Sequence, residues 1–419
     1  MDRVILHSDC NNFYASVECM LNPSLKGKFV AVGGNEEERH GIILAKNEAA
    51  KRMGVKTGET LWQAKLKCPD LIIVPPHYEQ YIAVSAATRE IYHDNTNQVE
   101  PFGLDEAWLD VTGEDGLTAA RRISARIKRE LGITVSIGVS FNKVFAKLGS
   151  DYKKPDAITV IDRNNFRTLA WGLPVTDLLY VGRATGERLN RMGIRTIGEL
   201  ANIPVEFLRN RFGKNGETLH RYANGEDTSR VAFFGEVPPV KSVGNSITTV
   251  RNLVCRDDVL RVMTVLCQSV AMRLRADSIK GRRVSVYLRT NALVGCSRQA
   301  TLPAYTSRER DILQAVMEIV DNVHDWRIPL RSVGVSVSQL TTQTDNEQTD
   351  LFTDPEKLAQ RDRLTEQIDR LKNKYGKGII VPATVLADPL LTAFEYGTQF
   401  NPFGVRSGSF VDGISHKIP

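Results

Sequence analysis

The sequence predicts an α/β protein of several domains. The chain has 419 residues, more than one ordinary domain holds, so length alone predicts two to four domains. Short apolar strands alternate with amphipathic helices up to residue 165, the strand pattern stops over residues 166–231, and a β-α-β-β-α-β string follows over residues 241–340. These observations predict helices packed against at least two separate sheets.

The first part of the chain predicts one sheet covered by helices. Residues 3–10 form a first apolar strand, and residues 117–131 form an amphipathic helix because their apolar side chains recur at helical spacing. The other expected elements are helix 13–20, strands 30–32 and 42–45, helices 47–53, 61–67 and 78–95, strands 98–103, 106–111 and 134–140, helix 142–150 and strand 157–161.

The rest of the chain predicts a helical domain, a second sheet and a tail. Short helices between glycine turns fill residues 166–232, and residues 233–240 read as a linker because they contain two adjacent prolines. A charged helix near residues 355–375 precedes a segment rich in Gly, Pro and Phe. Between linker and tail we expect strand 242–249, helix 257–278, strands 283–290 and 298–302, helix 308–324 and strand 332–340.

The composition excludes several protein classes. Hydrophobic residues make up 42% and charged residues 25% of the chain, as in ordinary globular domains and unlike disordered, collagen-like or coiled-coil chains. No window approaches the ~18 consecutive apolar residues of a membrane helix, and the first residues do not resemble a signal peptide. The six cysteines are scattered without a C-x-x-C pair, so we expect reduced thiols in a cytoplasmic protein.

The positive charge is concentrated in one segment. The net charge is +6, and residues 241–344 hold fifteen Lys and Arg against eight Asp and Glu. Residues 345–419 have a net charge of −2 and residues 1–240 a net charge of +1. Such a local surplus favours a polyanion such as nucleic acid as partner, although an Arg-rich solvated surface gives the same count.

Three carboxylates are the first candidates for chemistry. Asp9 ends the first strand, and Asp105 and Glu106 lie in the turn between two later strands. Side chains around a turn converge, whereas neighbours in a regular strand point to opposite faces. Oxygen ligands suit Mg²⁺, which completes its shell with water and substrate phosphates, and two ions ~4 Å apart promote an in-line displacement. The alternative is three unrelated surface carboxylates, since acidic residues are common at turns.

Three separated motifs resemble the signatures of one family. Residues 9–18 read DCNNFYASVE, residues 103–110 read GLDEAWLD, and residues 136–147 read SIGVSFNKVFAK, with Lys-Lys-Pro at 153–155. In order and spacing they resemble the motifs of the Y-family DNA polymerases, the bacterial translesion enzymes of the DNA polymerase IV and UmuC type. The resemblance extends from residue 4 to about residue 340.

The resemblance implies a right-hand polymerase with palm, fingers, a helical thumb and a β-α-β-β-α-β little finger. The implied activity is template-directed addition of dNTPs to a primer 3′-hydroxyl, with low fidelity, without proofreading and with bypass of damaged template in DNA repair. The implied domains are the palm at 1–10 and 77–165, the fingers at 11–76, the thumb at 166–232, the linker at 233–240, the little finger at 241–344 and the tail at 345–419.

The resemblance also assigns a role to each matching metal-site residue. Asp9 and Asp105 would ligate two Mg²⁺ ions, and Glu106 would bind the ion that activates the primer 3′-hydroxyl. The backbone carbonyl of Cys10 would bind the ion on the nucleotide side, so its thiol has no required role. Tyr14 matches the steric gate, a ring that would clash with a ribose 2′-hydroxyl, although a half-buried helix tyrosine is the plain alternative.

The triphosphate contacts depart in part from the family pattern. Lys154 matches the lysine that holds the triphosphate as a point charge. The sequence Glu-Ala-Ala-Lys at 48–51 stands where the family has Tyr-Glu-Ala-Arg. Lys51 lacks the two-pronged geometry of Arg, so the resemblance implies a weaker contact there or one shifted to Lys46.

The expected DNA contacts lie in the thumb and the little finger. Residues 181–185 resemble a helix-hairpin-helix, whose backbone N–H groups bind a phosphate at a helix N-terminus; a plain glycine turn is the alternative. The strands at 242–249 and 332–340 each alternate small polar residues with apolar ones, which would let a phosphate backbone approach, although alternation by itself shows only a wet face. The expected DNA-binding residues are Gly182, Arg183, Ser242, Gly244, Arg251, Arg283, Arg289, Arg331, Ser332 and Ser336.

A short peptide after the little finger suggests a protein partner. Residues 348–352 read QTDLF, which resembles the peptide that binds the bacterial sliding clamp, with Gln348 as anchor and Leu351 and Phe352 as apolar side chains in a pocket. Five residues form a weak motif, and the alternative is that the two apolar side chains pack on the following helix. The expected partners are primer–template DNA, a dNTP and this clamp, and we expect a monomer.

Two other functions remain open at this point. The first is a non-catalytic DNA- and clamp-binding member of the family whose altered fingers no longer bind nucleotide. The second is a two-metal nuclease on an unrelated fold, which leaves Tyr14, Lys154 and the clamp-like peptide unexplained. The complete set of three carboxylates favours the polymerase.

Overall fold

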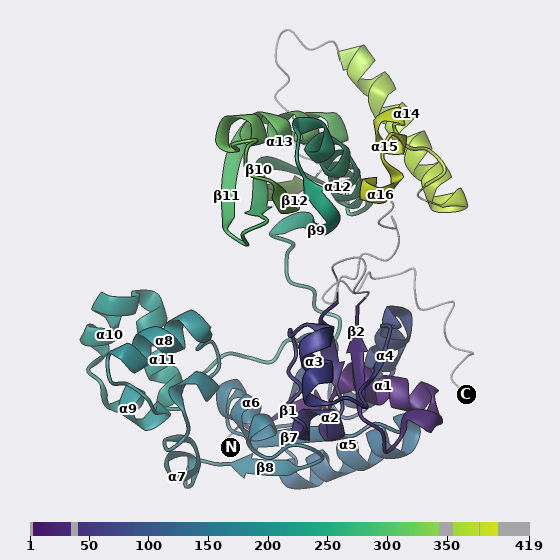
Figure 1. Cartoon of the computed structure of the whole chain (residues 1–419). Coiled ribbons are helices and arrows are strands. Elements are labelled where there is room, and N and C mark those ends of the chain that lie inside the picture. The colour runs from purple at the N-terminus through teal and green to yellow at the C-terminus, as the bar shows by residue number, and fades with distance from the viewer. Residues whose placement is uncertain (1–2, 35–40, 343–354, 377, 393–419) are drawn as a thin grey trace. The chain divides into compact units, whose positions relative to one another are not determined.

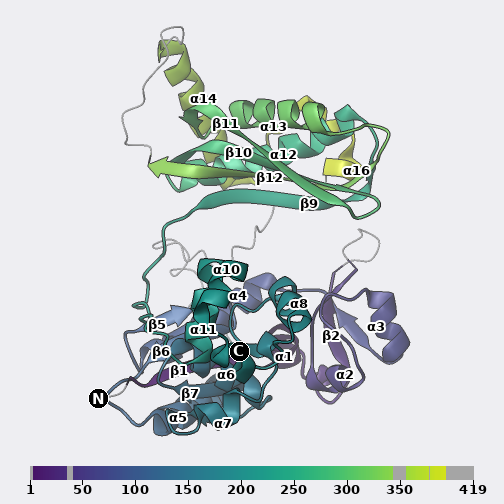
Figure 2. The ribbon, with the colours of Figure 1, turned by 90° about the vertical axis from the view of Figure 1, so that its left-hand side faces the viewer.

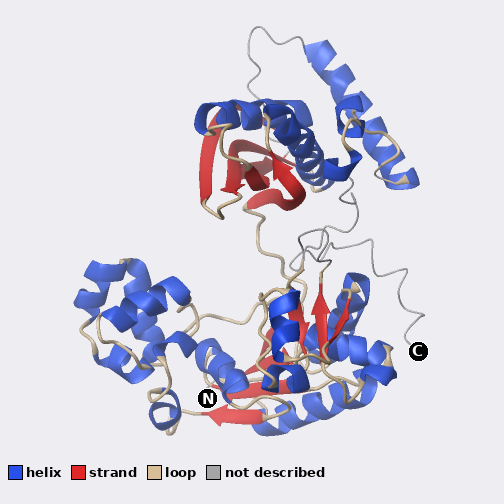
Figure 3. Ribbon diagram, in the orientation of Figure 1, coloured by secondary structure: helices blue, strands red, loops and turns tan. Residues whose placement is uncertain are grey.

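The computed structural model describes residues 3–34, 41–342, 355–376 and 378–392, which form two compact units (Figure 1). Unit 1 holds the described residues up to 237 except Gly41, and unit 2 holds Gly41 and those from 238 onward. Figure 3 shows that unit 1 combines strands, covering helices and one purely helical part, whereas unit 2 packs helices against a single sheet. No helix in the described part of the chain is both long and apolar enough to cross a membrane.

The central sheet of unit 1 is built around its first strand. The strand order is β5-β6-β1-β7-β8, antiparallel throughout except for the parallel pair β7 and β8. All six residues of β1 are buried, because helices cover both faces of the sheet. The bounds of the strands are β1 (Ile5–Cys10), β5 (Val99–Pro101), β6 (Glu106–Asp110), β7 (Val135–Ser140) and β8 (Ile158–Ile161).

Three helices cover this sheet, and one of them carries site residues. Helices α4 (Tyr78–His93) and α5 (Gly116–Leu131) pack together beside one face, whereas α6 (Lys143–Tyr152) contacts β1, β7 and β8. Gly138 of β7 allows α6 to lie close, since a Cβ there would come within 1.9 Å of the carbonyl oxygen of Ala146. Close packing of α6 fixes the height of its side chains above the strand ends.

A smaller sheet in unit 1 has the order β3-β2-β4. The strand β4 was not predicted, because three residues carry too little pattern and its parallel pairing with β2 joins segments far apart in the sequence. The elements of this part are α1 (Phe13–Leu21), β2 (Val30–Gly33), β3 (Ile43–Lys46), α2 (Glu48–Arg52), α3 (Leu61–Lys67) and β4 (Ile72–Val74).

The helical part of unit 1 follows β8 and agrees with the expected strand-free segment. Its short helices enclose a core that includes Leu189, Ile197 and Leu219. The helices are α7 (Phe166–Ala170), α8 (Arg183–Arg191), α9 (Ile197–Asn202), α10 (Val205–Phe212) and α11 (Lys214–Ala223).

Unit 2 confirms the predicted β-α-β-β-α-β string. Its strands form one antiparallel sheet in the order β11-β10-β12-β9, and Figure 2 shows the two helices on one side of it. The strands are longer than the pattern predicted because their ends continue into polar residues. The elements are β9 (Ser242–Leu253), α12 (Arg256–Ala276), β10 (Ile279–Thr290), β11 (Gly295–Thr306), α13 (Glu309–Val323) and β12 (Leu330–Thr342).

The segment after β12 returns to this sheet domain. Helix α14 (Pro355–Tyr375) is attached by ion pairs, one of which joins Arg275 to Asp369 at 2.6 Å. The short helices α15 (Ala383–Leu386) and α16 (Pro389–Thr392) pack on α12, and Leu391 is buried in its core. The sequence left residues 378–392 in a tail, because so short a segment has no clear periodicity, yet they complete the surface of unit 2.

Candidate active site

The three candidate carboxylates meet where strands β1 and β6 lie side by side. Asp9 and Glu106 are direct partners across the antiparallel pair. The Cys10 N–H donates a hydrogen bond of 2.8 Å to the carbonyl oxygen of Asp105, which holds Asp105 against the end of β1. Gly103 begins this turn with φ of +93°, a conformation that favours glycine. Strand pairing therefore converges residues that are nearly one hundred positions apart.

The three carboxylates carry more negative charge than the neighbouring cationic side chains neutralise. Burial, followed by the charges of Asp9 and Glu106, raises the pKa of Asp105 to about 6. Burial and Glu106 likewise raise the pKa of Asp9 above its ordinary value. Raised carboxyl pKa values at one point show that the charged forms lack sufficient positive partners, which is common at functional sites.

Two lysines of the same region lie against these carboxylates. Lys154 Nζ lies 2.7 Å from Asp9 Oδ2. Lys147, from α6, lies 3.2 Å from Asp9 Oδ2 and 3.0 Å from Glu106 Oε2. Both lysines also contact Asp151, at 3.0 and 2.8 Å. Lys154 was expected here from the sequence, whereas Lys147 and Asp151 were not.

A buried histidine lies beneath the carboxylates and was also missed. His7 Nε2 lies 3.3 Å from Glu106 Oε2, and its Nδ1 lies 2.8 Å from the hydroxyl oxygen of Ser150. Burial, and then the charge of Lys147, hold the pKa of His7 well below its ordinary value. The signal that could have found it is alternation along the strand, since His7 and Asp9 share one face.

Tyr14 stands on α1 within a group of tyrosines. Its ring stacks on Tyr81 at a centroid distance of 4.2 Å and an interplanar angle of 10°. It meets Tyr78 edge-on at 6.1 Å. Burial, followed by Tyr78 and Asp105, raises the pKa of Tyr14 to about 12. The ring is thus fixed from behind and lies near the carboxylates.

The Cys10 thiol points away from this chemistry. It is fully buried beside Tyr92, and burial raises its pKa well above the ordinary value. A protonated, enclosed thiol is not available as a ligand. This leaves only the backbone of Cys10 for the expected role.

The two lysines expected for the triphosphate lie near each other in the small sheet region. Lys46 donates a hydrogen bond of 2.9 Å to the Thr57 hydroxyl, and Lys51 lies 3.7 Å from Glu48. Burial, and then repulsion from Lys51, lower the pKa of Lys46. Two neighbouring ammonium groups that repel each other favour an anion between them.

The carboxylates fit a metal that takes part of its shell from its substrate. Among the described residues, no group of three or more His, Cys, Asp or Glu side chains is placed to hold a metal ion. Mg²⁺ is commonly held by one or two carboxylates with waters and phosphate oxygens, not by an all-protein cage. Asp9, Asp105 and Glu106 supply that donor type, and their unmet negative charge suits a cation.

The open face of the sheet in unit 2 consists of polar rows that run across its four strands. Ser336 pairs with Gly244 on β9 and with Ser285 on β10. A Cβ at Gly244 would approach the Ser336 Cβ to 2.6 Å, so the small residues also have a packing reason. Ser332 is buried, 2.8 Å from the Thr248 hydroxyl, whereas Ser242 and Gly244 are exposed.

The four expected arginines of this domain differ in their surroundings. Arg251 is paired with Asp258 at 2.9 Å and with Asp388 at 2.6 Å, so its charge is neutralised in place and we leave it out of the DNA surface. Arg283 is half-buried and forms no ion pair with any residue the structure describes. Arg289 donates to the Leu293 carbonyl oxygen at 3.2 Å.

The remaining predicted DNA-binding and clamp-binding residues lie in three separate places. Arg331 is half-exposed beside a break in the β12–β9 register. Gly182 is the N-cap of α8, and Arg183, the first residue of that helix, pairs with Glu187 at 2.8 Å with 93% of its side chain exposed. The clamp-like residues Gln348, Leu351 and Phe352 lie outside the described residues.

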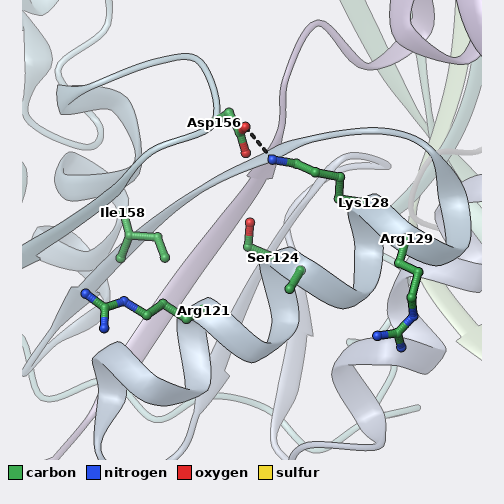
Figure 4. Close-up of a pocket in the computed structure, with 7 residues that line it drawn as sticks. Arg121, Ser124, Lys128, Arg129, Asp156 and Ile158 are labelled. Atoms are coloured by element: carbon green, nitrogen blue, oxygen red, sulfur yellow. Dashed lines mark hydrogen bonds and ion pairs between the residues drawn. The ribbon is translucent and has the colours of Figure 1, made fainter.

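A shallow hollow on the outer side of α5 contains none of the candidate residues (Figure 4). Lys128 and Asp156 pair across it at 2.6 Å. Its lining residues are Arg121, Ser124, Ala125, Lys128, Arg129, Asp156 and Ile158. Because it is open and its lysine is already paired, we assign it no function.

Comparison with known proteins identifies the family. The model of the impB/mucB/samB family matches residues 8–151, and that of its C-terminal domain matches residues 240–351. DNA polymerase IV of Acetivibrio thermocellus is 49% identical over 381 residues, which cover 90% of this chain and 96% of that protein. The chain belongs to the Y-family DNA polymerases.

Further matches extend along this polymerase. DNA polymerase IV of Moorella thermoacetica is 40% identical over 392 residues, 92% of this chain and 96% of that protein. A model described as the DNA polymerase-iota thumb domain matches residues 176–227. The solved Y-family DNA polymerase chimera Dbh-Dpo4(243-245)-Dbh shares the fold, with a TM-score of 0.72, 24% identity, and coverage of 81% of this polymerase and 99% of that chain.

Proposed function

We propose that this polymerase performs template-directed, low-fidelity DNA synthesis across damaged template, by nucleotidyl transfer that depends on two Mg²⁺ ions. The observation that carries the proposal is the convergence of Asp9, Asp105 and Glu106 beside Lys147 and Lys154. Family membership supports the reaction class. The raised pKa of Asp105 supports a cation at this point.

In this proposal the carboxylates bind the metal ions and Lys154 binds the nucleotide. Asp9, Asp105 and the Cys10 carbonyl would hold the ions, and Glu106 would bind the ion that activates the primer 3′-hydroxyl. When bound, the ions supply activation of the attacking hydroxyl and stabilisation of the leaving phosphate oxygen. Lys154 binds the dNTP triphosphate by its charge.

Nucleotide selection rests on the fingers and on Tyr14. Lys46 and Lys51, which repel each other in the free protein, take the outer phosphates between them. The Tyr14 ring, stacked rigidly on Tyr81, excludes a ribose 2′-hydroxyl. A ring that cannot turn away is a better steric gate than a mobile one.

DNA binding is divided between two regions. The open face of the sheet in unit 2, with Ser242, Gly244, Ser336 and Arg283, binds the phosphate backbone without reading sequence. Arg289, Arg331 and the buried Ser332 lie at one end of that face, and Gly182 with Arg183 adds a backbone contact in the thumb.

The domain roles and the remaining partners complete the proposal. Residues 1–10 and 77–165 act as palm, 11–76 as fingers, 166–232 as thumb and 241–344 as little finger, joined through the linker 233–240. Within the tail 345–419, residues 348–352 bind the sliding clamp through Gln348, Leu351 and Phe352. The enzyme works as a monomer in the cytoplasm.

Extension of a labelled primer–template with Mg²⁺ and four dNTPs tests the proposal. We expect extension by the wild type and about a hundredfold to thousandfold loss in Asp105→Ala, because groups that act on the transition state contribute on this scale. Asp70→Ala, a change at an exposed carboxylate of the fingers, is the matched control. No extension by any protein would favour the non-catalytic alternative, and shortening of the primer would favour a nuclease.

A further inference from the structure

The side chain of Lys147 occupies the space between two proposed metal ligands. Its ammonium lies 3.2 Å from Asp9 and 3.0 Å from Glu106, and only 14% of the side chain is exposed. Two carboxylates at these distances stabilise the ammonium form of a buried lysine. The lysine is therefore charged and acts as the counter-ion of both carboxylates.

This position creates a conflict with cation binding. An ammonium at hydrogen-bond distance from both carboxylates repels any divalent ion that needs the same oxygens. The wild-type site must therefore release Lys147 from both carboxylates, and Lys154, which lies 2.7 Å from Asp9, from one of them. A buried lysine without a second partner would pay a large desolvation cost on release.

The structure provides that second partner. Asp151 lies one helical turn along α6 from Lys147, with its Oδ2 at 3.0 Å from the lysine. Lys147 and Lys154 together hold the pKa of Asp151 below its ordinary value, although burial acts in the opposite direction. Asp151 is thus an ionised carboxylate that is not one of the proposed metal ligands.

We propose that Lys147 is a positioning residue that stands in for the metal in the free enzyme and withdraws onto Asp151 when divalent ions bind. The inference rests on the proposed metal-dependent function. Lys147 keeps Asp9 and Glu106 close together without metal, so the ligands are in place before substrate arrives. Asp151 determines how readily Lys147 leaves Asp9 and Glu106, and hence the metal concentration at which the site is occupied.

The test uses two variants that should act in opposite directions. Lys147→Met removes the competing charge, so we expect the free enzyme to bind Mn²⁺ at least about tenfold more tightly. Asp151→Asn removes the fallback partner and leaves Lys147, together with Lys154, on the carboxylates, so we expect about threefold weaker Mn²⁺ binding. Electron paramagnetic resonance of free Mn²⁺, measured without DNA or nucleotide, reports both.

Two controls make the outcome decisive. Lys128→Met breaks an ammonium–carboxylate pair elsewhere in unit 1, where Lys128 and Asp156 lie 2.6 Å apart, and should leave Mn²⁺ binding unchanged. Lys147→Gln keeps a hydrogen-bond donor without charge and should also tighten Mn²⁺ binding. It replaces Lys147→Met in the test if the methionine variant is too unstable to purify.

Other results would overturn the inference. Equal or weaker Mn²⁺ binding by the Lys147 variants, or unchanged or tighter binding by Asp151→Asn, contradicts the exchange of partners. Because this measurement needs no DNA synthesis, it is separate from the proposed function. If the wild type extends primers but the variants bind Mn²⁺ as the wild type does, only the inference about Lys147 is contradicted. If the wild type does not extend primers, the proposed function is contradicted.

Discussion

Two clusters of charged residues, one in each unit, reach opposite electrostatic states. In unit 1, Asp9 and Asp105 have raised pKa values because burial and neighbouring carboxylates outweigh the lysines. In unit 2, Asp258 has a lowered pKa, chiefly because Arg251 donates hydrogen bonds to it. The comparison separates a site that needs a cation from one that is already complete.

The difference lies in the match between donors and acceptors. Arg251 donates to both oxygens of Asp258 at 2.9 Å and to Asp388 at 2.6 Å, and the Val254 N–H donates to Asp258 at 3.0 Å. A planar guanidinium satisfies a carboxylate geometrically as well as electrically. Point charges such as Lys147 leave acceptor capacity for a ligand.

The largest expected effect is on catalysis in unit 1. Asp105→Asn should lower primer extension about a hundredfold to thousandfold, while the metal-free protein stays as stable as the wild type or becomes more stable, since a carboxylate with a raised pKa is removed. Extension assays and calorimetry in EDTA check the two parts. A clear fall in stability would show that the carboxylate is structural and would break the comparison.

The second effect is on stability in unit 2. Asp258→Asn should lower the free energy of unfolding of unit 2 by about 1–2 kcal/mol, because it leaves Arg251, which is partly exposed, with Asp388 as its remaining ionic partner. Differential scanning calorimetry measures the change. Asp277→Asn, at an exposed position after α12, is the control. Equal effects of the two substitutions would remove the distinction between the clusters.

The third effect is an opposite pH dependence of the stability that Asp105 and Asp258 contribute without metal. Asp105 has a folded-state pKa of about 6, above the ordinary unfolded value, so its protonation should add about 2 kcal/mol to the free energy of unfolding of unit 1 as the pH falls from 7 to 4. Asp258 has a lowered pKa. The stability that it contributes to unit 2 is therefore present at pH values above the pKa of an ordinary aspartate and is lost as the pH falls below it. Calorimetry at several pH values, with Asp105→Asn to remove the first trend, tests the signs.

The smallest effect concerns DNA affinity. Arg283 lies on the open sheet face, pairing with Ser338 across the ladder, and its removal should weaken DNA binding a few-fold and lower the salt slope by about one. Arg256→Ala is the control, since Asp321 already neutralises Arg256 at 2.8 Å. Fluorescence anisotropy at several salt concentrations measures both. Identical salt slopes for the two variants would contradict the proposed DNA surface.

Local sequence patterns were enough to predict most elements and part of the site. The helix Leu61–Lys67 and the helix Pro355–Tyr375 begin and end where the pattern placed them. The carboxylates Asp9, Asp105 and Glu106 stood out at a strand end and a turn, but only the resemblance to the polymerase motifs selected them as a site. Such features depend on neighbours within a few residues, and those are visible in the sequence.

Tertiary structure decided which charges are free and which are occupied. The sequence treated Arg251 as available for DNA, yet its partner Asp388 lies 137 residues further along the chain. It gave Lys147 no role, yet that ammonium meets Asp9 across 138 residues. Strand pairing and close packing of α6 bring these groups together, so the amino-acid order determines which charged groups exist, and only the folded chain determines which of them neutralise one another.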